Sequence, residues 1–418
     1  MSLPSESSAR RTATVIGGGP SGLMAAEVLA ESGLQVDLYE HMPSVGRKLL
    51  LAGRSGLNLT NSEPIDEMVA RFGPASPVCD AVRSFPPTAL REWAAGLGEP
   101  TYIGSSGRVF PTSFRATPLL RAWLASLAEH GVRMHLRHRW LGWGIETDGT
   151  LDSTMHRFRT VGGEVTEHRS DVTVFALGGA SWPRVGSDGS WVPHFRAAGI
   201  EVAALRPANC GLHIEWSRVF VEQFAGVPLK NVRVSAGSST ARGDVMVTDR
   251  GLESGPIYMI SAEVRDIVDR DGTCTVTIDL HPDLTRDAVI ARLSSRRPKD
   301  SMTTFLRRSL GLSPAAIALL REATDNELPS APITLAPLVK AVTLAVQSVA
   351  PIERAISTAG GVSFDDLDGR FMIRRLPGTF IAGEMLDWEA PTGGYLLQAS
   401  FSTAVAAANG AIAWLAEP

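Results

Sequence analysis

The spacing of hydrophobic residues changes twice within the first 40 positions. Residues 13–16 form a continuous apolar run, which predicts a short buried strand. Residues 23–32 are rich in Ala, Leu, Met and Glu, which predicts a helix that stops at Gly33. Residues 35–39 alternate between polar and apolar side chains, so we expect a second strand ending at Glu40. This order of strand, helix and strand predicts a βαβ unit with parallel strands.

The turn between the first strand and the helix has the spacing GxGxxG. Gly17 permits a tight turn, Gly19 lets a pyrophosphate approach the backbone, and Gly22 lets the helix pack closely on the strand. The N-terminus of the helix offers free N–H groups to phosphate. Glu40 follows Gly22 by 18 residues, where a carboxylate can accept hydrogen bonds from a ribose. The segment predicts a dinucleotide site without separating NAD from FAD.

The next segment carries two cations and many small or amide side chains. Arg47 and Lys48 lie where a second pass along the cofactor phosphates would run. Residues 49–61 can bring backbone N–H groups and amides close to a planar ligand. We therefore expect this loop to contact the cofactor, although an ordinary connection between a strand and a helix would look similar.

The C-terminal residues repeat the pattern of a strand, a glycine-rich turn and a helix. Residues 380–384 form a short apolar strand that ends in Gly383 and Glu384. Residues 392–394 form a second glycine-rich turn, and a small-residue helix is expected at about 397–415. Such a turn is again an anion site, and in an FAD enzyme it would hold flavin N1 and O2.

Two central segments could approach the same cofactor. Residues 174–179 predict a strand that meets two glycines, including Gly178, and residues 131–140 predict a strand that contacts adenine through its backbone. His135 and His138 would lie on opposite faces of that strand, so we expect no metal site.

We expect the nucleotide domain to be interrupted. It would comprise residues 1–205 and 346–418, and residues 206–345 would form an inserted substrate or cap domain. The insert has strand character at residues 232–235, 244–248 and 275–280, and helical patterns at 286–293 and 301–310.

Composition narrows the classes of protein. Hydrophobic residues make up 44% of the chain and charged residues 20%, which is ordinary for a globular protein. Three cysteines without CxxC spacing argue against a disulfide-stapled secreted fold and against a dithiol relay. No segment is predicted to span a membrane, and we expect a cytoplasmic protein.

The net charge of −4 gives nucleic-acid binding no support from the whole chain. Residues 286–310 nevertheless hold seven basic residues against two acidic ones. This stretch either binds RNA phosphates or forms a solvated helical face, and we favour the solvated face.

The motifs together resemble the BaiN/RdsA family of NAD(P)/FAD-dependent oxidoreductases. The resemblance rests on VIGGGPSGLMAAE, GRKLLLAGRSGLNLTN, GRVFP, ALGG and AGEMLDWEAPTGGYLLQASFSTA, which occur in family order across nearly the whole chain. It implies a Rossmann-like, glutathione-reductase-like α/β domain that binds FAD and is interrupted by an insert with strands and helices. It also implies flavin-dependent reduction, with family members acting on a conjugated steroid acid or on a uridine of ribosomal RNA.

The resemblance also implies which residues touch FAD. Besides Gly17, Gly19, Gly22 and Gly178, these are Pro20, Ser21, Glu40, Arg47, Lys48, Asn58, Trp140, Gly383, Glu384, Gly394, Tyr395 and Leu396. Two departures indicate a divergent subgroup. The family loop GGGRCNLTN is AGRSGLNLTN here, without cysteine, and the family's GGYN is GGYL, with Leu396 in place of Asn.

Three functions remain open at this point. The first is a reductase that takes electrons from NAD(P)H, which visits transiently because no second GxGxxG follows a strand, and passes hydride from flavin N5 to a conjugated C=C of a small molecule. The second reduces uridine in ribosomal RNA, and the third binds flavin for partner interaction without turnover. Arg54, Arg108 and Tyr395 are the candidate catalytic groups, and the arginines are better suited to stabilise an oxyanion because they do not deprotonate.

Overall fold

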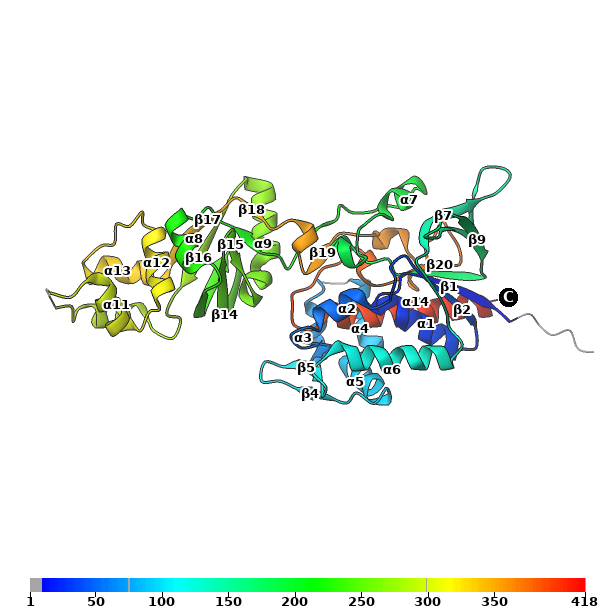
Figure 1. Ribbon diagram of the computed structural model, residues 1–418, viewed down its shortest axis with the longest axis horizontal. Coiled ribbons are helices and arrows are strands. Elements are labelled where there is room, and N and C mark those ends of the chain that lie inside the picture. The colour runs from blue at the N-terminus through cyan, green and yellow to red at the C-terminus, as the bar shows by residue number, and fades with distance from the viewer. Residues whose placement is uncertain (1–9, 74–75, 298, 418) are drawn as a thin grey trace, which may run out of the picture. The chain divides into compact units, whose positions relative to one another are not determined.

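A computed structural model describes residues 10–73, 76–297 and 299–417, which form two units (Figure 1). Unit 1 is built from the described residues of Met1–Arg206 and Ser357–Pro418, and unit 2 is Pro207–Ile356. The sequence predicts that the second division lies after residue 345. It lies later because β17 (Val342–Val346) and β18 (Ser348–Val349) pair with strands of the unit 2 sheet.

A parallel five-stranded sheet forms the centre of unit 1. Its strand order is β20-β10-β1-β2-β6, and all four pairings are parallel. The strands are β20 (Thr379–Ile381), β10 (Val172–Phe175), β1 (Thr12–Ile16), β2 (Gln35–Glu40) and β6 (Arg133–Leu136). β1 and β10 are apolar and almost fully buried, as expected for central strands of a parallel sheet.

Helices α1 (Pro20–Glu31) and α14 (Tyr395–Ala416) pack against each other. α14 is the one helix of the described residues with the length and apolarity to cross a membrane. Half of its apolar window is buried inside the protein, against α1, α4 (Pro77–Ser84) and the sheet. Packing in the core of unit 1 therefore explains why α14 is apolar.

Other helices of unit 1 surround this core. They are α2 (Arg47–Ala52), α3 (Ile65–Ala70), α5 (Pro87–Gly96), α6 (Ala116–Glu129) and α7 (Val192–Ala197).

Unit 1 also contains two smaller antiparallel sheets of three strands each. One contains β7 (Arg139–Ile145), β8 (Leu151–Arg159) and β9 (Val165–Arg169), and the other has the order β3-β5-β4. The latter comprises β3 (Thr60–Asn61), β5 (Arg108–Pro111) and β4 (Thr101–Ile103). The prediction of one strand over residues 131–140 is wrong: Arg137 adopts a left-handed conformation, with φ of 61°, and separates β6 from β7.

Unit 2 is a seven-stranded antiparallel sheet with helices. The strand order is β17-β16-β13-β14-β15-β12-β18. Its other strands are β13 (Pro228–Ala236), β14 (Ser239–Thr248), β16 (Cys274–Asp279), β15 (Gly251–Glu253) and β12 (Leu212–His213). Its helices are α8 (Arg218–Phe224), α9 (Gly255–Asp271), α10 (Arg286–Leu293), α11 (Met302–Leu310), α12 (Pro314–Glu322) and α13 (Pro332–Lys340). The predicted fold class, a Rossmann-like α/β domain interrupted by strands and helices, is confirmed.

Candidate functional site

The first glycine-rich turn joins β1 to α1, and two of its glycines are required by packing. Gly17 has φ of 112°, and a Cβ there would overlap with the carbonyl group of Ala176. A Cβ on Gly22 would overlap with the carbonyl oxygen of Gly17. These two positions allow the helix to start directly on the end of the strand.

Gly19 has a different environment. It precedes α1 with φ of −80°, makes no side-chain cap, and has no atom within 4 Å of the place that a Cβ would occupy. Pro20 begins the helix, where its missing N–H costs nothing. The N-terminus of α1 therefore presents uncapped N–H groups and open space, which together suit a phosphate.

Glu40 lies at the end of β2 beside this turn. Its Oε2 accepts a hydrogen bond from the Gly18 N–H at 2.8 Å, and its Oε1 accepts one from the Met42 N–H at 2.7 Å. Oε1 also lies 3.2 Å from His41 Nδ1, whereas Oε2 keeps a second lone pair for a ligand hydroxyl. Glu40 thus shapes the turn as well as being available to a ribose.

The last glycine-rich strand end meets the first turn directly. A Cβ on Gly383 would overlap with the Ser21 hydroxyl, so the Gly383 backbone contacts the Ser21 side chain although the two residues are far apart in the sequence. Gly383 has φ of 75°, and its N–H donates to the Thr403 hydroxyl at 3.0 Å. The structure therefore brings the N-terminal and C-terminal motifs together.

A half-buried ion pair links α2 to the same place. Lys48 Nζ donates to Glu384 Oε2 and to the Ser181 hydroxyl, both at 2.6 Å. Glu384 Oε1 accepts from the Thr358 N–H at 3.0 Å. Gly178, with φ of 72°, precedes this cluster, and its carbonyl accepts from Trp191 Nε1.

Arg47 begins α2 beside Lys48. Its Nη1 donates to the Ser44 hydroxyl at 3.2 Å, whereas its Nε is buried with no partner among the described residues. The carbonyl oxygen of the Asn58 side chain, the Ser187 hydroxyl and the Thr392 hydroxyl are likewise buried without a described partner.

The second turn precedes α14. Gly393 has φ of 136° and Gly394 φ of 101°, and a Cβ on Gly394 would overlap with the Thr60 backbone in β3. Asn61 Nδ2 donates to the Gly393 carbonyl at 3.2 Å and fixes the turn on β3. Leu396, in the second position of the helix, is half-buried.

Tyr395 is a buried phenol that holds its proton. Its ring packs edge-on against Phe72, which in turn packs against Trp388. The Arg71 guanidinium lies over the Tyr395 ring, 5.8 Å from its centroid. Burial, together with the neighbouring Glu63 carboxylate, raises the pKa of Tyr395 to about 12. The group can donate a hydrogen bond at neutral pH, but it is a weak acid.

The two candidate arginines lie on the small sheet and its flank. Arg108 stands opposite Asn61 in the β3–β5 pair and is half-buried, and Arg54 is exposed just after α2. The guanidinium groups of both lack an ion pair or a hydrogen bond to any described residue.

Trp140 is placed in an aromatic core rather than at the turns. Its ring is buried against Trp143, Phe175 and Phe195, and its Nε1 donates to His156 at 3.3 Å. A contact between its backbone and adenine stays a prediction.

Sequence reasoning missed Asn61, Ser181, Thr358 and Ser187. Asn61 lies within the amide-rich loop, and Thr358 precedes a pair of glycines, so weak signals existed for both. Among the described residues, no group of three or more His, Cys, Asp or Glu side chains is placed to hold a metal ion.

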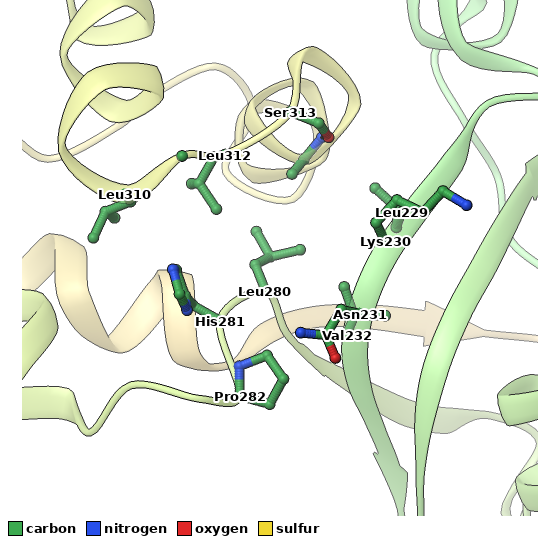
Figure 2. A pocket seen from close by; sticks show the side chains of 12 residues that line it. Leu229, Lys230, Asn231, Val232, Leu280, His281, Pro282, Leu310, Leu312 and Ser313 are labelled. Atoms are coloured by element: carbon green, nitrogen blue, oxygen red, sulfur yellow. The ribbon is translucent and has the colours of Figure 1, made fainter. Parts of the chain in front are cut away.

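Unit 2 contains a separate cavity of about 170 Å³. It lies between the β13 bulge and the α11–α12 turn, and Figure 2 shows Leu280 and Leu312 facing its interior. Its charged residue Lys230 is already paired with Asp244. His281 also lines the cavity, but none of the sequence-predicted site residues does.

The residues around the turns fit a dinucleotide. Buried polar atoms without partners at Arg47, Asn58 and Thr392, and the open space at Gly19, indicate where its polar groups would bind. Lys48 supplies a positive charge, although Glu384 partly neutralises it.

Comparisons with known proteins agree with this chemistry. The model of the HI0933-like protein Rossmann domain matches residues 11–410. The 3-dehydro-bile acid delta(4,6)-reductase of Clostridium scindens is 25% identical and aligns with 95% of this chain and 98% of its own. The ribosomal RNA dihydrouridine synthase of Escherichia coli is 24% identical and aligns with 97% and 98%. The 3-ketosteroid delta1-dehydrogenase of Sterolibacterium denitrificans shares the fold, with a TM-score of 0.54, 12% identity, and coverage of 96% of this chain and 99% of that one.

Proposed function

The chain belongs to the HI0933-like family of flavin-dependent oxidoreductases with a Rossmann FAD-binding domain, and from this premise we propose that it is an NAD(P)H-driven reductase of a conjugated C=C in a small molecule. The observation that carries the proposal is the meeting of the two terminal motifs. Ser21 contacts Gly383, and Lys48 pairs with Glu384, so two glycine-rich turns share one place in unit 1. The relative from Clostridium scindens, which is named as a reductase of a steroid acid, supports the small-molecule substrate.

The chain's own residues divide the work of holding the cofactor. The N-terminus of α1 would bind the pyrophosphate, Glu40 the ribose, and the turn before α14 the pyrimidine edge of the flavin. Bound FAD supplies the ring that accepts and delivers hydride. Arg54 and Arg108 carry guanidinium groups that would bind a negatively charged group of the substrate. Tyr395, with its raised pKa, would keep its proton and donate a hydrogen bond.

The first test identifies the flavin and its reductant. We expect the purified protein to release non-covalent FAD on denaturation, and anaerobic NADH or NADPH to bleach the flavin before an added enone restores its colour. FMN in the supernatant would contradict the cofactor assignment. Loaded FAD that neither nicotinamide reduces would favour a binding protein without turnover.

Ribosomal RNA is the second candidate substrate, and exposed arginines favour it. Arg286 and Arg292 on α10 and Arg307 on α11 make no ion pair with a described residue, whereas Arg308 pairs with Asp300 and Arg297 lies close to the same carboxylate. The relative from Escherichia coli, named as a ribosomal RNA dihydrouridine synthase, points the same way.

Charge reversal separates the two substrates. If RNA is the substrate, changing Arg292, Arg297 and Arg307 to Glu should weaken RNA binding and flatten its salt dependence, since each phosphate contact contributes roughly 0.7–0.9 to the log–log slope. Flavin content should not change, because these residues lie in unit 2. A normal dihydrouridine content of ribosomal RNA in a deletion strain would remove this candidate.

A further inference from the structure

The outer face of the β3–β5–β4 sheet carries exposed aromatic rings. Val109 and Pro111 of β5 point into the protein, so Arg108 and Phe110 share the opposite face. Tyr102 pairs directly with Phe110, and their ring centroids lie 5.8 Å apart at 29°.

Phe114 extends this surface. Its ring centroid lies 5.2 Å from that of Phe110, and it covers the backbone of Gly56. Tyr102 is 44% exposed and Phe114 42% exposed, which is unusual for neighbouring aromatic side chains in unit 1. We call Tyr102, Phe110 and Phe114 the aromatic face.

Three arginines surround the aromatic face. Arg108 lies on it, Arg115 follows Phe114, and Arg54 lies two residues before Gly56, which Phe114 covers. None of their guanidinium groups makes an ion pair or a hydrogen bond with a described residue.

Neighbouring arginines behave differently. Arg71 pairs with Glu63, Arg83 with Asp66, and Arg91 donates to Thr101. The aromatic face is therefore bordered by positive charge that the described part of the chain does not balance, and an anionic group from outside would be complementary to it.

The aromatic face is continuous with the turn before α14. Asn61 stands opposite Arg108 across the β3–β5 pair, and directly opposed residues have Cβ atoms about 5 Å apart. The Asn61 side chain donates to the Gly393 carbonyl, and Gly394 rests on the Thr60 backbone. The surface thus begins where the proposed function places the flavin ring.

We propose that the aromatic face, with Arg54, Arg108 and Arg115, binds the substrate, and that the substrate is a flat apolar molecule that ends in an anionic group. The inference rests on the proposed function for the position of the flavin. The rings cover the apolar body, and the planar guanidinium groups form paired hydrogen bonds to a carboxylate, sulfate or phosphate. The reacting end of the molecule then points toward the Gly393–Gly394 turn.

The test compares two probes of one shape with the FAD-loaded protein. Pyrenebutyrate is flat, apolar and anionic, and pyrenebutanol is its neutral counterpart. Changing Arg54, Arg108 and Arg115 together to Gln should weaken pyrenebutyrate binding at least tenfold and leave pyrenebutanol binding within twofold. Tyr102→Ala should weaken both probes to a similar extent. Arg159→Gln serves as the control, since Arg159 is exposed on β8 and has no partner among the described residues.

The visible spectrum of the bound flavin gives a second measure of pyrenebutyrate binding. Pyrenebutyrate should shift the visible absorption of bound FAD in the parent protein, because the aromatic face borders the Gly393–Gly394 turn. A triple variant that binds pyrenebutyrate as the parent does would overturn the proposal. It would also be overturned if a single-stranded oligouridylate bound more tightly than pyrenebutyrate and required the same arginines.

A failure of the proposed reductase function would give a different result from a failure of the proposed substrate surface. If the probes bind as expected and shift the flavin spectrum, but no nicotinamide reduces the flavin, the surface assignment stands and the reductase assignment falls. If the protein holds no flavin, the reductase assignment falls, and the loss of pyrenebutyrate affinity in the triple variant still decides whether the arginines bind anions.

Discussion

The two glycine-rich turns of unit 1 use glycine in different ways. In the turn before α1, Gly17 and Gly22 meet neighbouring carbonyl groups, while Gly19 faces open space with an ordinary φ of −80°. In the turn before α14, Gly394 has a positive φ and also lies against β3. In the first turn the open position, Gly19, is therefore separate from the packed positions, whereas in the second turn the packed glycine, Gly394, is also one that needs a positive φ.

This difference matters for experiments. A substitution at Gly394 would disturb the packing on β3 as well as the flavin contact proposed there, so a loss of flavin from such a variant would have two explanations. A substitution at Gly19 changes only the space in front of α1.

Gly22→Ala should have the largest effect. Its Cβ would overlap with the Gly17 carbonyl oxygen, a backbone atom that cannot turn away, so we expect a loss of about 3 kcal/mol or more in the free energy of unfolding. Denaturant unfolding of the apoprotein measures it. A loss below about 1 kcal/mol would mean that α1 can shift along the strand, and the comparison of the turns would fail.

Gly394→Ala should lower the free energy of unfolding of the apoprotein by about 2–3 kcal/mol. The alanine would adopt φ near 101°, which is strained for an L-residue, and would press on the Thr60 backbone. Gly73→Ala is a useful control, since Gly73 also has a positive φ, of 86°, but open space around the added Cβ. Equal losses in the two variants would show that φ alone matters and that the contact with β3 does not.

Lys48→Met should lower the free energy of unfolding by about 1–2 kcal/mol, because it leaves the half-buried Glu384 carboxylate without its cation. The loss is not larger because solvent partly screens this pair. The double variant with Glu384→Gln should recover part of that loss. Urea unfolding of the four proteins gives the coupling between α2 and the end of β20. Additive losses would indicate that the ion pair does not join the two motifs energetically.

Helices α1 and α14, which follow the two turns, also differ in the polar side chains that they bury. α14 buries Gln398, whose Nε2 donates to the Phe85 carbonyl, whereas α1 buries Glu27, which accepts hydrogen bonds from Trp93 and Trp123. Burial raises the pKa of Glu27 despite these hydrogen bonds. The folded protein therefore binds this proton more tightly than the unfolded chain, and the ionised group destabilises the fold as the pH rises above about 4.5.

Glu27→Gln should remove this pH dependence. We expect the stability of the variant relative to the parent to increase between pH 4 and 7, as measured by thermal unfolding across that range. Glu129→Gln, at an exposed position of α6, is the control, since Glu129 does not contribute to the shift at Glu27. If the difference in stability between Glu27→Gln and the parent were constant from pH 4 to 7, Glu27 would titrate in the folded protein as it does in the unfolded chain.

The local parts of this architecture could be predicted from the sequence. Each turn lies between a strand and a helix that are adjacent in the chain, so glycine spacing and hydrophobic period were sufficient for β1, α1, β2 and α14. The limits of α1 differed by three residues at its start, because Pro20 begins the helix.

The contacts between distant segments could not be predicted. Lys48 and Glu384 are separated by 336 positions, and Asn61 and Gly393 by 332. Nothing in the local pattern identifies such partners. The break at Arg137 was missed for another reason, since arginine rarely adopts a left-handed conformation and gives no signal of a turn.

The most direct test of a cofactor at the first turn is the FAD affinity of Gly19→Ala. Gly96→Ala is the matched control, because that glycine also has open space and no positive φ. Both apoproteins should unfold within about 1 kcal/mol of the parent, since no atom lies within 4 Å of the added Cβ at either position. Flavin titration should then show FAD affinity at least about tenfold weaker for Gly19→Ala alone, equivalent to about 1.4 kcal/mol. An unchanged affinity in Gly19→Ala would place the pyrophosphate elsewhere and contradict the account.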